Sequence, residues 1–224
     1  MQNLSINQNG IEVISGLTSS EQINSIIAQV NNSEESIPKH GVRNAEKKFS
    51  SINQLIKSQN IISAAQSVLG KEPQLVRVIY FDKTPDKNWL VTWHQDKTVA
   101  LDHKFSSVGW GPWTVKDKTH HVQPPLEVLN TMVTFRVHLD KANKDNGCLK
   151  VIPDSHKLGI LKQDEVNVAV QNNSSVLCEV EVGDTIVMRP HLLHSSSKSS
   201  ISGHRRVVHI EFSSYDLPNN ARWA

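Results

Sequence analysis

The chain has 224 residues and a mass of 25.1 kDa, a length that suits one sizeable domain. Hydrophobic residues make up 38% of the sequence and charged residues 21%, which excludes a largely disordered chain and favours a globular protein. Lys and Arg number 24 against 22 Asp and Glu, for a net charge of +2. This balance excludes an electrostatic argument for nucleic acid or an anionic membrane as partner.

The sequence also carries little sign of export or membrane insertion. It contains no apolar run near the roughly 18 residues of a membrane span, and the opening MQNLSINQNG lacks the basic start and apolar segment of a secretory signal. Cys148 and Cys178 form no CxxC pair, which argues against a disulfide framework or a cysteine zinc site. We expect a cytoplasmic protein with both thiols buried on strands.

The first part of the chain predicts one strand and one helix. The segment GIEVISG (10–16) has the composition of a short strand. Thr18 and Glu21 could form a capping box that opens a helix over 19–30, because the following isoleucines and valine fall on one face.

A polar loop and a second helix follow. The segment 31–44 contains Pro38 and Gly41 and predicts a loop. Apolar residues over 50–68 fall on one stripe, which predicts a second helix, and Gly70 is a suitable stop signal.

After Gly70 the pattern changes to short β-branched runs separated by turn residues. This succession of strands after two helices favours a double-sheet jelly roll. The segment 102–130 is too long for a tight connection, so we expect a lid or substrate loop there. The predicted strands are 74–81, 89–96, 131–139, 148–152, 175–182, 184–189 and 205–212.

Two segments carry residues that could bind one metal ion. WHQD (93–96) ends a predicted strand, and residues i and i+2 of an extended chain point to the same face, so His94 and Asp96 present an imidazole and a carboxylate together. RPHLLH (189–194) contains two histidines, one of which could meet that pair inside the sandwich. Two histidines and one carboxylate on one face of an ion leave positions open, as in non-haem Fe(II) oxygenases.

The motif of His94 and Asp96, taken alone, has a second interpretation: His94 could be an ordinary surface or hydrogen-bonded histidine. Arg205 strengthens the metal interpretation, because it opens the strand after the second histidine segment. Its guanidinium could bind a dicarboxylate cosubstrate through two hydrogen bonds. The alternative for Arg205 is a surface ion pair.

Together these segments resemble the phytanoyl-CoA dioxygenase family of Fe(II)- and 2-oxoglutarate-dependent oxygenases. The resemblance covers nearly the whole chain, through GIEVISGLTSSEQI, WHQD, NGCLKVIPDSHKLG, GDTIVMRPHLLHSSS and HRRVVHIEF. It implies a mainly β fold with flanking helices, the double-stranded β-helix or jelly roll, in a single domain over 1–224 with its core at about 74–214. Asp154 stands where the family usually has Gly, at a turn position that Asp tolerates.

Carried over residue by residue, the resemblance implies that His94, Asp96 and His194 bind iron and form the catalytic centre. His191 is the rival for the third position, but the family places its ligand at the Leu-Leu-His-Ser step, which is His194 here. The resemblance further implies that O2 and 2-oxoglutarate are cosubstrates, and that 2-oxoglutarate is converted to succinate and CO2. Related halogenases lack the carboxylate ligand, so Asp96 favours hydroxylation.

The resemblance assigns the cosubstrate site to Arg205 and Ser196, which would hold the far carboxylate of 2-oxoglutarate. Arg136 is a further candidate, because the family pattern puts it near the cosubstrate. It alternates with the apolar residues of 131–139, so it enters the cavity only if the polar face of that strand points inward. If the apolar face points inward, Arg136 is solvated.

Substrate contacts are expected from the loops and the region of the metal motif. Ordinary packing is the alternative for the tryptophans, and a solvated loop position for the basic residues. A second arginine in the cavity would suit a small, anionic substrate, and the sequence does not specify an oligomeric state. The candidates are Trp93, Trp110, His121, Lys83 and Arg43.

Two other classes of protein compete with the oxygenase. A cupin-like metal-binding jelly roll of another reaction class has no role for Arg205 and would not carry Asp96 in that position. A non-catalytic binding module predicts a missing ligand, whereas this set is intact. Nucleic-acid demethylases with a similar motif usually show a second arginine where this chain has Glu211, so we discount them.

Overall fold

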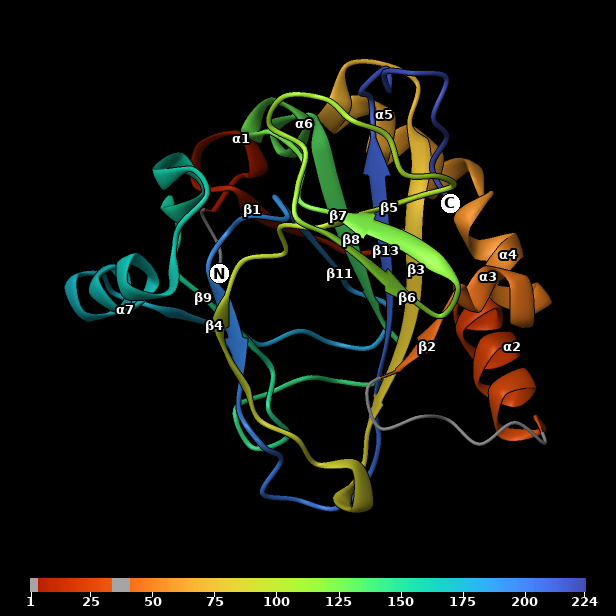
Figure 1. The fold of residues 1–224 in the computed structure, drawn as a ribbon. Helices are drawn as coiled ribbons and strands as arrows, with labels where there is room; N and C mark the ends of the chain where they lie inside the picture. The colour runs from red at the N-terminus through yellow and green to blue at the C-terminus, as the bar shows by residue number, and fades with distance from the viewer. Residues whose placement is uncertain (1–3, 34–40) are drawn as a thin grey trace.

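A computed structural model of the chain describes residues 4–33 and 41–224, and within these residues six strands form one antiparallel sheet and four form a second. In spatial order the larger sheet contains β1 (Ile11–Ile14), β11 (Thr185–Met188), β8 (Met132–His138), β13 (Arg205–Ser213), β3 (Gln74–Lys83) and β2 (Val42–Arg43). The smaller sheet contains β10 (Val176–Cys178), β9 (Leu149–Val151), β12 (His194–Ser196) and β4 (Val91–His94). The sheets face each other, and the predicted double-stranded β-helix is confirmed (Figure 1).

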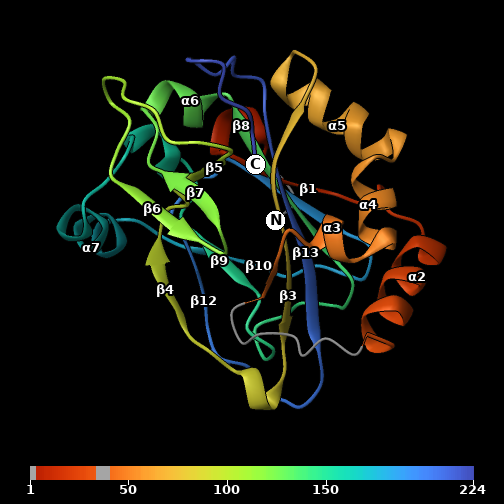
Figure 2. The same cartoon turned by 45° about the vertical axis from the view of Figure 1, so that its right-hand side comes forward.

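Helices cover the outer face of the larger sheet, as Figure 2 shows from a second side. This layer contains α2 (Ser20–Asn31), α3 (Ala45–Lys48), α4 (Ser50–Ile56) and α5 (Gln59–Leu69), while α1 (Ile6–Asn9), α6 (Leu126–Asn130) and α7 (Gln163–Asn172) lie elsewhere. Half of the loop predicted over 31–44, residues 34–40, lies outside the described residues, and Val42–Arg43 within it form strand β2.

The helix predictions need two corrections. The capping box of α2 is formed by Ser19 and Gln22 rather than Thr18 and Glu21, because Ser19 is the extended residue that precedes the first helical turn. The single helix predicted over 50–68 is two helices, since Ser58 adopts an extended conformation between α4 and α5. The predicted stop at Gly70 is confirmed, with a left-handed φ of 69°.

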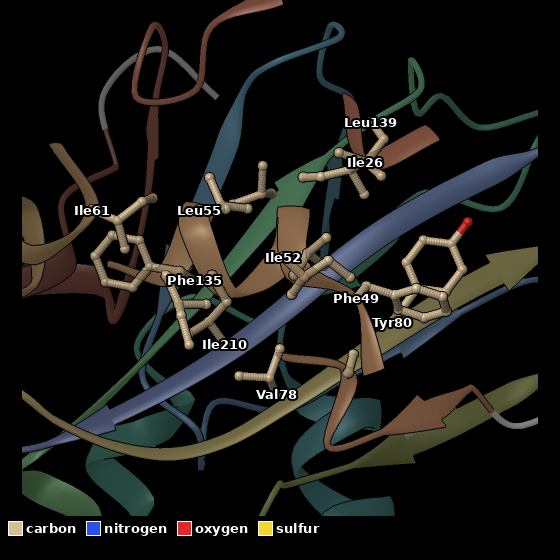
Figure 3. Close-up of a cluster of buried hydrophobic side chains, with 14 of the residues drawn as sticks. Ile26, Phe49, Ile52, Leu55, Ile61, Val78, Tyr80, Phe135, Leu139 and Ile210 are labelled. Carbon is tan, nitrogen blue, oxygen red and sulfur yellow. The ribbon is translucent and has the colours of Figure 1, made fainter. Parts of the chain in front are cut away.

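The main core lies between these helices and one face of the larger sheet. Val133, Phe135 and Val137 of β8 belong to this core. Figure 3 shows Phe135 there together with Ile210 of β13 and Ile52 of α4. Since side chains alternate along a strand, the polar face of β8 points the other way, into the space between the two sheets. Because the apolar residues of β8 face the helices, the residues that alternate with them place polar groups on the inner face of the larger sheet.

The segment predicted as a long loop over 102–130 contains its own hairpin. Strands β6 (Trp113–Lys116) and β7 (Thr119–Val122) pair with each other and with β5 (Val99–Leu101). The turn uses Asp117 and Lys118, both with positive φ, which is the geometry of a tight two-residue hairpin turn. In Figure 1 this hairpin lies in front of β8, between β4 and β3.

Within the part of the chain that the structure describes, no helix combines the length and apolar character needed to cross a membrane. Cys148 and Cys178 are both buried, as predicted. Cys178 lies in β10, whereas Cys148 lies one residue before β9 and not on a strand.

Ile52 tests the contribution of the helical layer, because its side chain is fully buried in the main core. We expect Ile52→Ala to lower the free energy of unfolding by about 2–5 kcal/mol, through lost burial and the cavity left behind. Val168→Ala on α7 is the control, since Val168 is 55% exposed and should change stability by less than about 0.5 kcal/mol. Equal effects in urea unfolding would contradict this packing.

Candidate metal centre

The pairing of β4 with β12 brings two histidines together. His94 and His194 are direct partners across these antiparallel strands, and their ring centroids lie 4.2 Å apart. Asp96 follows two residues after the end of β4, where its backbone N–H donates to the carbonyl of Pro190 at 2.9 Å. This bond places the carboxylate 3.7 Å from Nε2 of His94 and 3.6 Å from Nε2 of His194.

Backbone carbonyls orient both imidazoles. Nδ1 of His94 lies 2.8 Å from the carbonyl of Thr92, and Nδ1 of His194 lies 2.9 Å from the carbonyl of Leu192. A carbonyl only accepts hydrogen bonds, so Nδ1 of each ring carries the proton. The lone pair of each Nε2 is therefore left for a metal ion, the arrangement that outer hydrogen bonds of histidine ligands usually produce.

The geometry and the protonation states fit a divalent metal. The ligand atoms of His94, Asp96 and His194 lie within 4.8 Å of one another, and the 3.6–3.7 Å separations are compatible with bonds of about 2.1 Å to one ion. Burial raises the pKa of Asp96, but the neighbouring imidazoles and Arg77 outweigh it and the pKa falls. Burial and then His94 lower the pKa of His194 to about 3. An ionised carboxylate and a neutral imidazole are the states that metal binding needs.

Gln95 points away from the metal centre and secures the surrounding loops. Its amide donates to the carbonyls of Gly159 and His191, both at 2.7 Å, and accepts from the N–H of Leu161 at 2.8 Å. His191 itself is fully buried beside His156, with ring centroids 6.1 Å apart. Of the two histidines that the sequence offers, the structure brings His194 to Asp96.

A second grouping, Asp96 with His209 and Glu211, also lies within 4.8 Å. Glu211 already accepts a hydrogen bond from Arg77 at 2.5 Å and lies 2.9 Å from Nε2 of His209. Nδ1 of His209 lies 3.0 Å from Nη1 of Arg136. Because Arg136 can only donate, Nδ1 accepts and Nε2 donates to Glu211. His209 is thus a neutral link that holds Arg136, and it has no lone pair free for a metal.

A cavity of about 220 Å³ adjoins the metal centre between the two sheets. Its walls come from both sheets and from the β6–β7 hairpin. The lining residues include Arg43, Arg77, Ile79, Phe81, Trp89, Val91, His94, Asp96, Thr98, Lys116, His121, Arg136, Leu149, His194, Ser196, Arg205 and His209.

One end of this cavity buries guanidinium groups that have no acidic partner among the described residues. Arg205 is 4% exposed, and its Nε and Nη1 have no hydrogen-bond partner among the described residues. Nε of Arg136 is also buried without a partner there. Burial first, and then the charge of Arg136, lowers the pKa of Arg205 to about 10. Uncompensated buried charge is costly, so this end of the cavity is suited to bind an anion.

Lys83 adds a third cation beside Arg205 and Ser196, although it is not itself among the residues that line the cavity. It is opposite Arg205 in the β3–β13 register, and its ammonium donates to Oγ of Ser196 at 3.0 Å and to the carbonyl of Ser197 at 2.6 Å. The hydroxyl of Ser196 donates to the carbonyl of Gly147 at 2.7 Å, so in this state it accepts from Lys83. Burial first, then the arginines, lowers the pKa of Lys83 to about 7.

The remaining candidates for substrate contacts fall into two groups. Arg43 and His121 line the cavity. Trp93 packs against a separate cluster near α7, and Trp110 packs on Phe105 with ring centroids 5.0 Å apart. These two tryptophans are absent from the cavity lining described above, because each is used to hold a surface element to the sheets; the nearby tryptophan that lines the cavity is Trp89.

Four residues at the site were not predicted from the sequence: Arg77, Lys116, His209 and Glu211. Arg77 and Lys83 are an even number of residues apart on β3, and His209 and Glu211 stand in the same relation to Arg205 on β13. Applying the strand alternation outward from Lys83 and Arg205 would have found three of them. Lys116 had no such signal, since its hairpin was expected to be a loop.

Removing a ligand from the metal centre should remove metal binding. We expect Asp96→Ala and His194→Ala to weaken Co(II) or Fe(II) affinity by more than about 100-fold, beyond the 10–100-fold typical of losing an outer hydrogen-bond partner. His191→Ala is the matched control and should keep the affinity within about tenfold. Anaerobic metal titration measures this, and loss of metal by His191→Ala alone would reverse the assignment.

Lys83 predicts a pH dependence of stability. Its pKa is about 7 in the folded chain, against an ordinary value of 10.5, so between these values the folded state binds fewer protons than the unfolded state, and stability rises with pH. We expect Lys83→Met to raise the melting temperature without added anions, most at pH 7 and below, and progressively less toward pH 10. A variant less stable than the wild type at pH 6.5 would contradict this.

Comparison with known proteins agrees with this geometry. The family model described as phytanoyl-CoA dioxygenase (PhyH) matches residues 6–207. Phytanoyl-CoA dioxygenase 1 of Oryza sativa subsp. japonica is 28% identical over 163 residues, which cover 67% of this chain and 49% of the rice protein. The chain thus spans about half the length of that curated relative.

Two solved structures have the same fold. The non-heme alpha ketoglutarate dependent epimerase SnoN from nogalamycin biosynthesis matches with a TM-score of 0.70 and 15% identity, over 93% of this chain and 80% of SnoN. HygX from Streptomyces hygroscopicus, with nickel and 2-oxoglutarate bound, matches with a TM-score of 0.67 and 16% identity, over 93% of this chain and 83% of HygX. Together with the match over residues 6–207, these findings establish that the chain belongs to the phytanoyl-CoA dioxygenase family of non-haem iron, 2-oxoglutarate-dependent oxygenases.

Proposed function

We propose that this protein binds Fe(II) and 2-oxoglutarate and uses O2 to hydroxylate a small molecule, with conversion of 2-oxoglutarate to succinate and CO2. The observation that carries the proposal is the pairing of a two-histidine, one-carboxylate centre with buried cations that have no acidic partner among the described residues. A dicarboxylate would neutralise those cations while its other end reaches the metal, so the two features account for each other.

In this proposal Arg205 and Lys83 bind the far carboxylate of 2-oxoglutarate. Both are nearly inaccessible to solvent, at 4% and 1% exposed, so their bonds to a carboxylate would be strengthened by the low local dielectric. Ser196 supports the ammonium of Lys83 through the 3.0 Å bond and thereby positions it. When the carboxylate binds, the pKa of Lys83 should rise again, because its charge gains a partner.

Arg136 contributes a second guanidinium whose direction is set by other side chains. Its bond to His209, and the bond from His209 to Glu211, restrict the planar group to one orientation. Arg77 completes the set by binding the same oxygen of Glu211. Such preorganisation reduces the entropy lost when the cosubstrate is ordered. We therefore assign Arg136 to binding the cosubstrate. We assign His209, Glu211 and Arg77 to positioning Arg136.

Bound iron would supply the activation of O2 that no side chain can supply. The three ligands would hold it from one side and leave the remaining positions toward the cavity. The β6–β7 hairpin would limit the access of water, since Trp113 packs on Phe105 with ring centroids 5.3 Å apart and fastens the hairpin. The carboxylate of Asp96 would occupy one coordination position of the iron, which favours hydroxylation over halogenation. One of the similar solved structures is an epimerase. The mass of the product distinguishes the two reactions, because hydroxylation adds one oxygen atom to the substrate and epimerisation leaves its mass unchanged.

The direct test is anaerobic titration of the protein with Fe(II) and 2-oxoglutarate, followed by admission of O2. We expect a visible charge-transfer band, then succinate in proportion to the 2-oxoglutarate consumed. Arg205→Ala should bind metal normally and 2-oxoglutarate at least about 100-fold more weakly, as for the loss of a buried charge-assisted pair. Arg222→Ala should behave like the wild type, since Arg222 is not among the residues that line the cavity. A wild-type protein without the band and without succinate would refute the proposal.

A further inference from the structure

The cavity has a second end, well separated from the proposed carboxylate site. The β3–β13 register pairs Lys83 with Arg205 at one end and Arg77 with Glu211 at the other. Arg205 and Glu211 are six residues apart on one strand, a distance of about 20 Å at the usual rise per residue. A ligand group near Arg77 would therefore be distinct from the cosubstrate carboxylate near Arg205.

This second end continues toward the surface. A small pocket beside the main cavity shares Arg43, Arg77, Lys116 and His121 with it. A groove lined by Arg43, Lys47, Lys48 and Asp117, among others, lies next to both. Arg43 lines all three spaces, and Lys116 comes from the hairpin that lies between β3 and β4 (Figure 2). A substrate that enters from the groove passes these basic residues before it reaches the metal centre.

The basic residues here are able to take an anionic ligand. The side chain of Lys116, which lines the cavity, makes no hydrogen bond or ion pair to another described residue, although its backbone pairs with Thr119 in the hairpin. Arg43 binds Asp117 at 3.0 Å, but the two side chains are 34% and 62% exposed, and such pairs contribute little to stability. Arg43 can therefore exchange Asp117 for a ligand at small cost. Arg77 is bound to Glu211 through Nη2, while its Nε is buried without a partner among the described residues.

His121, a buried residue of β7, lies in surroundings with a net positive charge. It is 2% exposed, and its Nδ1 has no partner within the described chain. Burial lowers its pKa to about 4, followed by the charges of Arg77, Lys116 and Arg43, which outweigh the opposing effect of Glu211. The surroundings are thus net positive, and the neutral ring has one N–H to donate to a ligand.

We infer that the substrate is a small acid, and that its carboxylate or phosphate group binds to Lys116, Arg43 and His121 at the end of the cavity opposite Arg205. This inference rests on the proposed function for the position of the reacting carbon, which would lie between that anionic group and the metal. Arg77 lines the same two spaces as these residues and adds positive charge. Charge-assisted hydrogen bonds at such a site fix orientation as well as affinity, so the anionic group would select which C–H bond faces the metal.

The experiment uses the anaerobic iron-loaded protein with saturating 2-oxoglutarate, so that the cosubstrate end is filled. Hexanoate, hexyl phosphate and the neutral analogue hexanamide are titrated by calorimetry. We expect one or both acids to bind at least about tenfold more tightly than the amide, and their order distinguishes a carboxylate site from a phosphate site. The imidazole of His121, followed by NMR, should show a higher pKa when the acid is bound, because the anion stabilises its charged form.

Two charge reversals on the same hairpin locate the site. Lys116→Glu should weaken binding of the acid at least about tenfold, as for one lost charge-assisted bond and one added repulsion. Lys118→Glu is the matched control, since Lys118 is the turn neighbour and does not line the three spaces described above; it should leave binding unchanged. Both variants should keep the iron and 2-oxoglutarate charge-transfer band, which shows that they are folded and loaded.

Three results would overturn the inference: binding of none of the probes, binding of hexanamide as tight as that of the acids, or equal effects of Lys116→Glu and Lys118→Glu. Failure of the proposed function would look different, because the wild type itself would then lack the charge-transfer band. In that case the same probes and the same two variants, titrated into the protein as isolated, still decide whether this end of the cavity binds acids.

Discussion

The site depends first on the antiparallel pairing of β4 with β12. That register sets His94 opposite His194, and the bond from the N–H of Asp96 to Pro190 turns the carboxylate toward both rings. A shift of either strand by one residue would send one imidazole to the other face of the sheet. The surrounding structure protects this register, because Gln95 ties the adjoining loops together from the opposite face.

The second constraint is electrostatic. The apolar face of the larger sheet packs against the helices. The alternate residues of its strands therefore point their charged side chains into the space between the two sheets. Some of that charge is neutralised internally, as in the pair of Arg77 with Glu211. Arg205, Arg136 and Lys83 have no acidic partner in the described chain. These unpaired buried charges lower the free energy of unfolding. Binding of anions would raise it again, so the stability of the folded chain depends on its ligands.

The sequence predicted the parts of the site that depend on short-range geometry. His94 and Asp96 follow from strand alternation, and the choice of His194 over His191 needed the family pattern, because a tight turn carries the chain from β11 into the other sheet. The inward direction of Arg136 was undetermined, since both faces of β8 are buried and either could have formed the core. Trp93 and Trp110 do not line the cavity, because large aromatics near a motif serve packing as readily as binding. The break at Ser58 and the hairpin after Trp113 lacked strong local signals.

The central claim is that His94, Asp96 and His194 hold one iron ion between the two sheets. A crystal grown anaerobically with Fe(II), measured at the iron absorption edge, tests it most directly. We expect a single anomalous peak within about 2.3 Å of Nε2 of both histidines and of a carboxylate oxygen of Asp96. A peak instead among Asp96, His209 and Glu211, or none in an iron-containing crystal, would contradict it.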